Sequence, residues 1–133
     1  LASQTLTDLR LLISSIDEKM SLKILLCGQE KLSQTLKCSS QADLLQRITL
    51  QFMTKPMSKA QTAAYIDHRI TCAGGKEKIF ESQAKELIHD YTGGVPRQVN
   101  NVATACLINA AARGLKIVTE ALVNETMAEF RLP

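Results

Sequence analysis

The chain has 133 residues, a formal net charge of +3 and 45% hydrophobic residues, which suits one domain or two small lobes and argues against a disordered segment. Aromatic residues make up only 4% and Trp is absent, so we expect no stacking platform for single-stranded nucleic acid. No apolar run approaches the length of a membrane span, and the four cysteines lack zinc-ligand spacing. We therefore expect a cytoplasmic protein without a metal site.

The first part of the chain is predicted to alternate helices with strands. Apolar residues at helical spacing predict a helix that starts at Ser3, and they are Leu6, Leu9, Ile13 and Ile16. After a polar break at 17–21, the apolar run 23–28 ends in glycine, which is typical of a buried parallel strand. Short helices are predicted over 30–37 and 41–47. Alternating apolar and polar residues then predict a half-buried strand over 48–52.

Beyond Pro56 the pattern becomes entirely helical. Ser58 and Gln61 have the spacing of a capping box and predict the start of a helix that Gly74 and Gly75 end. The following helix is predicted to stop at Gly93, and its apolar stripe comprises Ala84, Leu87, Ile88 and Tyr91.

Two further helices complete the predicted bundle. One runs from Pro96 to Arg113, and its inward face comprises Val99, Val102, Ala103, Cys106 and Ala110. The last starts at Thr119, where Val118 and Val123 are spaced as a hydrophobic staple, and its stripe continues through Met127 and Phe130. Cys106 and Cys27 both lie in apolar runs, so we expect both to be buried.

The chain is therefore predicted to have two parts and to be mainly helical overall. Residues 1–55 correspond to the remnant of a parallel α/β sheet, and residues 56–133 to a four-helix bundle. Two strands alone cannot cover their own edges, so we expect that further strands lie outside this sequence or come from a partner.

The most informative segment joins the second and third of these four helices. Gly93 and Gly94 can adopt positive φ at no steric cost and so end a helix, while Pro96 suits the first position of the next. Arg97 then lies beside the unpaired N–H groups and the positive end of the helix dipole. Such a position attracts phosphate.

Three segments carry a resemblance to a known family. They are Ile24-Leu25-Leu26-Cys27-Gly28-Gln29-Glu30-Lys31-Leu32, Leu44-Leu45-Gln46-Arg47-Ile48 and Gly93-Gly94-Val95-Pro96-Arg97-Gln98-Val99-Asn100-Asn101. In this order they resemble ExeA-type AAA+ ATPases, which include a general-secretion-pathway ATPase and ATP-binding helpers of transposons. The resemblance covers essentially the whole chain. It implies that residues 1–55 are the C-terminal part of a P-loop NTPase core and that residues 56–133 are its helical lid.

The same resemblance implies roles for individual residues. Gln29 is matched to sensor-1, which orients the attacking water or contacts the terminal phosphate. Arg47 is matched to the arginine finger, which acts on the nucleotide of a neighbouring subunit in a homo-oligomer. Arg97 is matched to sensor-2, and we expect Gly94 and Pro96 to border the nucleotide with it.

The chain also departs from the family pattern. It contains no G-x-x-x-x-G-K-[ST] loop to cradle phosphates and no apolar strand ending in an acidic pair to hold Mg²⁺. Gly74-Gly75-Lys76 lacks the first glycine of such a loop and follows a predicted helix. We therefore expect ATP and Mg²⁺ to bind only the full-length parent, and this piece alone to hydrolyse no ATP.

Alternatives remain at each level. The alternative for Gln29 is an ordinary turn, and the alternative for Arg47 is a pair with Asp43, four residues earlier on a short helix. The alternative for the bundle is a protein- or DNA-binding module, with 82–91 and 96–113 as a helix-turn-helix. Within the ATPase interpretation, transposition with double-stranded DNA and a transposase is favoured over secretion.

Overall fold

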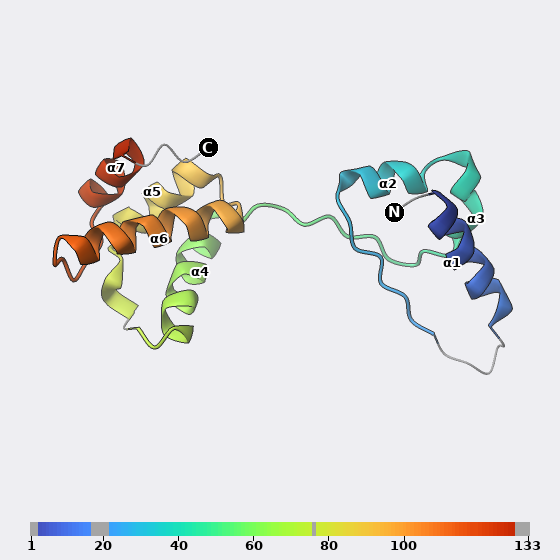
Figure 1. Ribbon diagram of the computed structural model, residues 1–133, viewed down its shortest axis with the longest axis horizontal. Coiled ribbons are helices and arrows are strands. Elements are labelled where there is room, and N and C mark those ends of the chain that lie inside the picture. Colours follow the sequence, from blue (N-terminus) through green and yellow to red (C-terminus); the bar gives the residue numbers. More distant parts are fainter. Residues whose placement is uncertain (1–2, 17–21, 76, 130–133) are drawn as a thin grey trace. The chain divides into compact units, whose positions relative to one another are not determined.

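The computed structural model describes residues 3–16, 22–75 and 77–129. The chain divides into two units, Leu1–Met53 and Thr54–Pro133 (Figure 1). The predicted polar break at 17–21, together with Lys76 and Phe130, lies outside the described residues.

The first unit is built from short helices. They are α1 (Ser3–Ser15), α2 (Glu30–Leu36), the 3₁₀ turn η1 (Ser39–Gln41) and α3 (Ala42–Gln46). The predicted helix start at Ser3 is confirmed. Leu6, Leu36 and Leu44 form its buried core, so each of the three α-helices contributes one fully enclosed leucine. Such a small core holds the helices together with little apolar burial.

The two predicted strands are not confirmed. Residues 22–29 and 48–58 form neither helix nor strand, and no strand occurs within the described ranges. The side chains of Leu25, Leu50 and Phe52 are 85%, 90% and 89% exposed. An apolar run becomes a buried strand only where neighbouring strands pair with it and helices cover it. No such neighbouring strand is present among the described residues, so the side chains of these apolar runs remain exposed.

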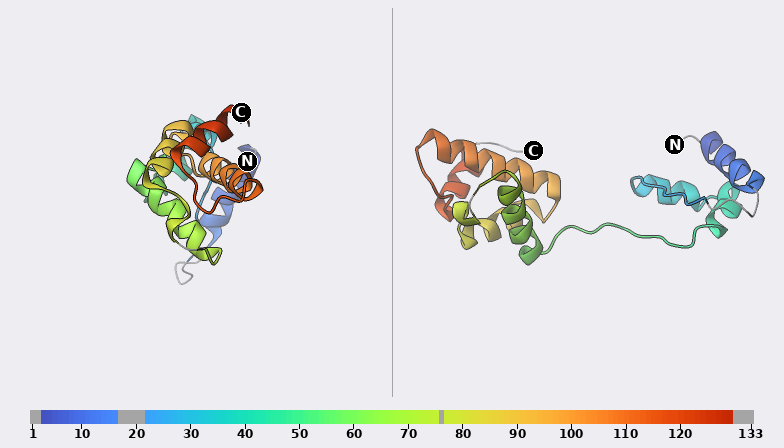
Figure 2. Two further views of the ribbon diagram at one scale, coloured as in Figure 1. Left: turned by 90° about the vertical axis from the view of Figure 1, so that its left-hand side faces the viewer. Right: turned by 90° about the horizontal axis from the view of Figure 1, so that it is seen from below.

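The second unit contains four α-helices. They are α4 (Lys59–Cys72), α5 (Ser82–Thr92), α6 (Pro96–Ala112) and α7 (Glu120–Glu129), with a 3₁₀ turn, η2 (Glu77–Ile79), after α4. Helix α5 packs against α4, α6 and α7, and α6 lies alongside α7 (Figure 2). The short connections between the helices follow the predicted order along the chain.

The core of the second unit confirms most of the predicted apolar stripes. Its buried members are Ile66, Phe80, Ala84, Ile88, Val99, Val102, Cys106, Ala110, Val118, Leu122 and Val123. Two predictions about buried residues are wrong. Tyr91 is 48% exposed, and its hydroxyl group donates a hydrogen bond to Asn124 Oδ1 at 2.9 Å. Cys27 is exposed, because the segment that carries it has no sheet around it.

The predicted helix boundaries of this unit rest on local contacts. The backbone N–H of Gln61 donates to Ser58 Oγ at 3.3 Å, and the N–H of Ser58 donates to Gln61 Oε1 at 2.9 Å, which confirms the capping box. At the start of α7, the N–H of Leu122 donates to Thr119 Oγ1 at 3.3 Å. These contacts satisfy N–H groups that lack a partner within the helix.

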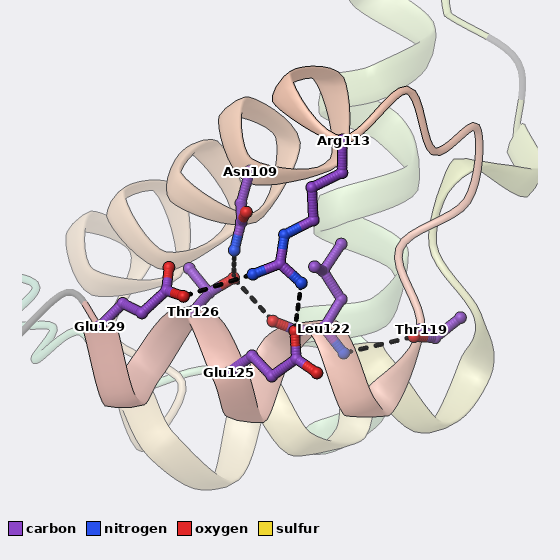
Figure 3. Close-up of polar contacts among 7 residues, drawn as sticks. All are labelled: Asn109, Arg113, Thr119, Leu122, Glu125, Thr126 and Glu129. Carbon is purple, nitrogen blue, oxygen red and sulfur yellow. Dashed lines mark hydrogen bonds and ion pairs between the residues drawn. The ribbon is translucent and has the colours of Figure 1, made fainter.

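Polar contacts link α6 to α7 (Figure 3). In the buried layer, Asn109 Nδ2 donates to Thr126 Oγ1 at 3.0 Å, and that hydroxyl donates to the carbonyl oxygen of Leu122 at 2.6 Å. At the surface, the Arg113 guanidinium pairs with Glu125 and lies 3.3 Å from Glu129 Oε1. The buried hydrogen bonds hold the two helices in one register, since an unpaired buried amide would be costly.

Candidate functional site

The Gly93-Gly94 segment forms the predicted helix stop. Helix α5 ends at Thr92, and its C-cap, Gly93, has φ 57° in the left-handed region. Gly94 also has positive φ, at 73°. The N–H of Val95 donates to the carbonyl oxygen of Thr92 at 3.1 Å and closes the turn. Both glycines are therefore used for a backbone conformation that other residues rarely adopt.

Arg97 lies in the first turn of α6, directly after Pro96 at the helix start. Both side chains are exposed, whereas Gly94 is buried. Helix α6 has 17 residues and no acidic residue in its first turn, so nothing within that turn offsets the positive end of its dipole. No hydrogen bond or ion pair to the Arg97 guanidinium occurs within the described part of the chain.

Gly94 is held by contacts on both sides. Its carbonyl oxygen accepts a hydrogen bond from the N–H of Met57 at 2.9 Å, and its own N–H donates to Thr92 Oγ1 at 3.4 Å. The Thr92 hydroxyl in turn donates to the carbonyl oxygen of Ile88 at 2.7 Å. Met57 and Thr92 were not identified from the sequence as part of this turn. Met57 carries no sequence signal, and the signal at Thr92 is only that a threonine stands in the last turn of a helix.

Gln29 occupies the N-cap position of α2. Its backbone is extended, with φ −76° and ψ 173°, its side chain makes no capping hydrogen bond, and the residue is exposed. Its carbonyl oxygen accepts from the N–H of Leu32 at 2.8 Å, which fixes the turn into the helix. The expected position at the end of a strand is not confirmed, since the segment before Gln29 is not a strand.

Arg47 is the C-cap residue of α3 and is exposed. The alternative pairing with Asp43 is wrong, because Asp43 Oδ2 lies 3.0 Å from Arg10 Nη1 on α1. Arg47 lines a shallow depression on the first unit, and the other lining residues are Arg10, Leu11, Ser14, Asp43 and Gln46. Two of the three charged groups there, Arg10 and Asp43, form an ion pair with each other.

The predicted site residues are distributed over both units. Gln29 and Arg47 belong to the first unit, and Gly94, Pro96 and Arg97 belong to the second. Only the last three lie together in one continuous, well-defined turn. The second unit therefore presents the more complete local site.

Other polar candidates have structural contacts instead. The Tyr65 hydroxyl donates to Asn100 Oδ1 at 3.2 Å and links α4 to α6. His89 Nδ1 lies 3.0 Å from Thr62 Oγ1, between α5 and α4. Within the described ranges, no group of three or more His, Cys, Asp or Glu residues could hold a metal ion, and no helix is long and apolar enough to cross a membrane.

Comparison with known proteins gives one informative relative. The chain is 38% identical over 110 residues to General secretion pathway protein A of Aeromonas hydrophila. The matched region is 82% of this chain but only 20% of that protein, so the chain spans about a fifth of its relative. No family model matches the chain, and no solved structure matches it. The similarity supports a relationship to ExeA-like proteins.

Proposed function

We propose that this chain is the C-terminal part of an AAA+ ATPase, in which the second unit is the helical lid. The observation that carries the proposal is the turn at Gly93–Arg97, which presents an exposed arginine at the start of a long helix. The relationship to an ExeA-like protein supports it, because that relationship covers 82% of the chain.

Arg97 is the residue to which we assign the contact with the terminal phosphates of ATP. A guanidinium group stays charged and donates through a rigid fork that matches phosphate oxygens. The free N–H groups at the start of α6 add positive potential at the same place. Gly94 and Pro96 would border the nucleotide, because they form the turn that places Arg97.

Gln29 and Arg47 receive the other two proposed roles. The exposed amide of Gln29 would orient the attacking water as sensor-1. The exposed guanidinium of Arg47 would act as the arginine finger on the nucleotide of a neighbouring subunit, which requires a homo-oligomer. Arg47 suits this role because Asp43 pairs with Arg10 and not with it.

The residues present fit a phosphate contact but do not fit a magnesium site. The Arg97 guanidinium supplies a cation, and the free N–H groups at the start of α6 supply hydrogen-bond donors, as a phosphate requires. Hard oxygen ligands of the kind that Mg²⁺ prefers form no cluster within the described ranges. We therefore derive no step through Mg²⁺ from this chain, and we expect ATP and Mg²⁺ to be bound mainly by other parts of the full-length protein.

Two biological settings follow from the ATPase assignment. Secretion is favoured by the name of the relative, General secretion pathway protein A. Transposition is the other setting that the sequence resemblance includes, and it would involve double-stranded DNA and a transposase. Both settings use the same proposed chemistry, in which closure of the lid on ATP changes assembly or partner binding.

ATP hydrolysis by the full-length protein tests this proposal. We expect hydrolysis that Arg97→Ala lowers by about 10²-fold or more, as for loss of a group that stabilises transition-state charge. Arg69→Ala on α4, also exposed, is the matched control and should hydrolyse ATP normally. Equal activity of both variants would refute the role of Arg97. Added double-stranded DNA should stimulate hydrolysis in the transposition setting and leave it unchanged in the secretion setting.

A second candidate is a binding module without an ATPase role. Ile108, Leu115 and Ile117, at and after the end of α6, are 60%, 48% and 46% exposed. Exposed apolar side chains suit a protein partner better than the base edges of DNA, which need hydrogen-bonding side chains. Absence of hydrolysis by the full-length protein under all conditions would favour this candidate.

A further inference from the structure

We infer that the Met57–Gly94 contact is a clasp that positions Arg97 from the segment joining the two units. The clasp is the hydrogen bond from the Met57 N–H to the Gly94 carbonyl oxygen, 2.9 Å long. Met57 is thus a positioning residue, and the inference rests on the proposed role of Arg97.

The packing at the clasp leaves no room for a side chain on residue 94. A Cβ built on Gly94 would lie 2.0 Å from the Met57 carbonyl oxygen and 2.9 Å from its carbonyl carbon. These are backbone atoms, so they cannot turn aside as the end of a side chain could. Gly93 differs, because a Cβ there would meet nothing within 4 Å. Gly94 therefore serves close approach as well as turn geometry.

Met57 is itself anchored to α4. It precedes Ser58, whose capping box fixes the helix start. Lys59 Nζ then pairs with Asp90 Oδ1 at 2.8 Å, which ties the same helix end to α5. The clasp thus adds a third tie, from this anchored point to the turn between α5 and α6.

The clasp lies close enough to Arg97 in the chain to affect where Arg97 is held. Gly94 lies three residues before Arg97, and Pro96 between them has a fixed φ, so a displaced Gly94 carries the start of α6 with it. Met57 lies at the end of the segment 48–58, which has no helix or strand. A displacement of this segment would therefore be transmitted to the turn before Arg97 by the hydrogen bond between Met57 and Gly94.

Amide hydrogen exchange on this chain tests the clasp without any activity assay. The Met57 N–H should be protected, and Gly94→Ala should speed its exchange by about tenfold or more, as expected when a local contact opens. Gly93→Ala is the matched control, since it has a similar positive φ of 57° and open space. Equal exchange rates for Met57 in both variants would overturn the clasp. If Gly94→Ala does not fold, the native chain alone decides, because a Met57 N–H that exchanges as fast as the Phe52 N–H in the same segment would overturn the clasp.

A double-mutant cycle in the full-length ATPase tests the effect on Arg97. Gly94→Ala should lower kcat by about 10- to 100-fold, the loss expected from misplacing a group by about 1 Å. The same change in an Arg97→Ala background should have little further effect, whereas a merely structural defect would lower activity in both backgrounds. Gly114→Ala, at φ 67° with nothing within 4 Å, should leave kcat unchanged.

The outcomes separate the clasp from the proposed function. A full effect of Gly94→Ala in the Arg97→Ala background overturns the positioning role alone. Normal hydrolysis by Arg97→Ala overturns the proposed function, and the positioning role with it. Fast Met57 exchange combined with a non-additive loss of kcat supports the clasp.

Discussion

The two units place the apolar residues of their predicted elements in opposite environments. In the first unit, Leu25, Leu50 and Phe52 lie in runs that predict strands, and they are 85% to 90% exposed. In the second unit, Ala84, Ile88 and Val99 lie on helical stripes and are all 0% exposed.

The difference follows from how each element buries its apolar face. A helix completes its own backbone hydrogen bonds and needs only another helix to cover its stripe. A strand needs a partner for its backbone and a covering layer for its side chains. The second unit supplies four helices that cover one another, whereas the described part of the first unit supplies no partner strand.

The largest test of this comparison is truncation of a core residue in the second unit. Ile88→Ala should lower the free energy of unfolding by about 2–5 kcal/mol, because it removes a fully buried side chain and leaves a cavity. Phe52→Ala in the first unit, 89% exposed, should change it by no more than about 0.5 kcal/mol. Urea denaturation followed by circular dichroism measures both. A large loss for Phe52→Ala would mean that the predicted strand is buried in solution.

A buried polar contact gives the next largest effect. Thr126→Val should cost about 1–3 kcal/mol, because it leaves the Asn109 amide without its partner in the buried layer. Thr104→Val on the exposed side of the neighbouring helix is the isosteric control and should be nearly neutral. The same denaturation experiment compares the two variants, and equal stability would show that the Asn109–Thr126 hydrogen bond adds nothing.

Loss of the capping box should have a smaller effect. Ser58→Ala removes the acceptor for the Gln61 N–H and should cost about 1 kcal/mol. Ser82→Ala at the start of α5 is the control, since the N-cap of that helix makes no side-chain hydrogen bond. Thermal unfolding of the two variants provides the measurement. A larger loss for Ser82→Ala would contradict the assignment of this helix start.

The smallest expected effect concerns the pH dependence of stability. Burial raises the pKa of the Cys106 thiol above its ordinary 9.0, and a hydrogen bond with Thr126 partly offsets this. The folded state therefore retains this proton to higher pH than the unfolded state. The contribution of the Cys106 thiol to the free energy of unfolding is fully present below pH 9.0, and it is lost as the pH rises through the pKa of the folded state.

Urea midpoints on either side of pH 9.0 measure this contribution. The fall in midpoint should be steeper in the native chain than in Cys106→Ala, which has no thiol to titrate there. Cys27→Ala is the control from the first unit, where the thiol is exposed, and its urea midpoint should fall as much as that of the native chain. A fall of the same size in all three proteins would contradict the assignment to Cys106.

Much of the second unit could be predicted from the sequence because its signals are local. The Ser58–Gln61 capping box, the stop at Gly93 and the start at Pro96 each depend on residues within one or two turns. The exposed position of Arg97 in the first turn of α6 follows from the same motif. Its proposed contact with phosphate stays a prediction.

Contacts between distant residues could not be predicted in this way. The sequence spacing offers a pair between Asp43 and Arg47 as an alternative, but Asp43 pairs with Arg10, which is 33 residues away in sequence. Met57 showed no sequence signal, yet its N–H binds Gly94. Such pairs depend on how whole helices pack, which no short segment encodes.

By itself, the sequence determined where the helices of the second unit start and end, because caps, glycines and apolar spacing act within a few residues. Only the tertiary structure decided which partners those helices bring together, and that the apolar runs 23–28 and 48–52 remain without strand partners. The physical reason is that helix hydrogen bonds are completed within the segment, whereas sheet pairing, burial and ion pairs need groups from elsewhere in the fold.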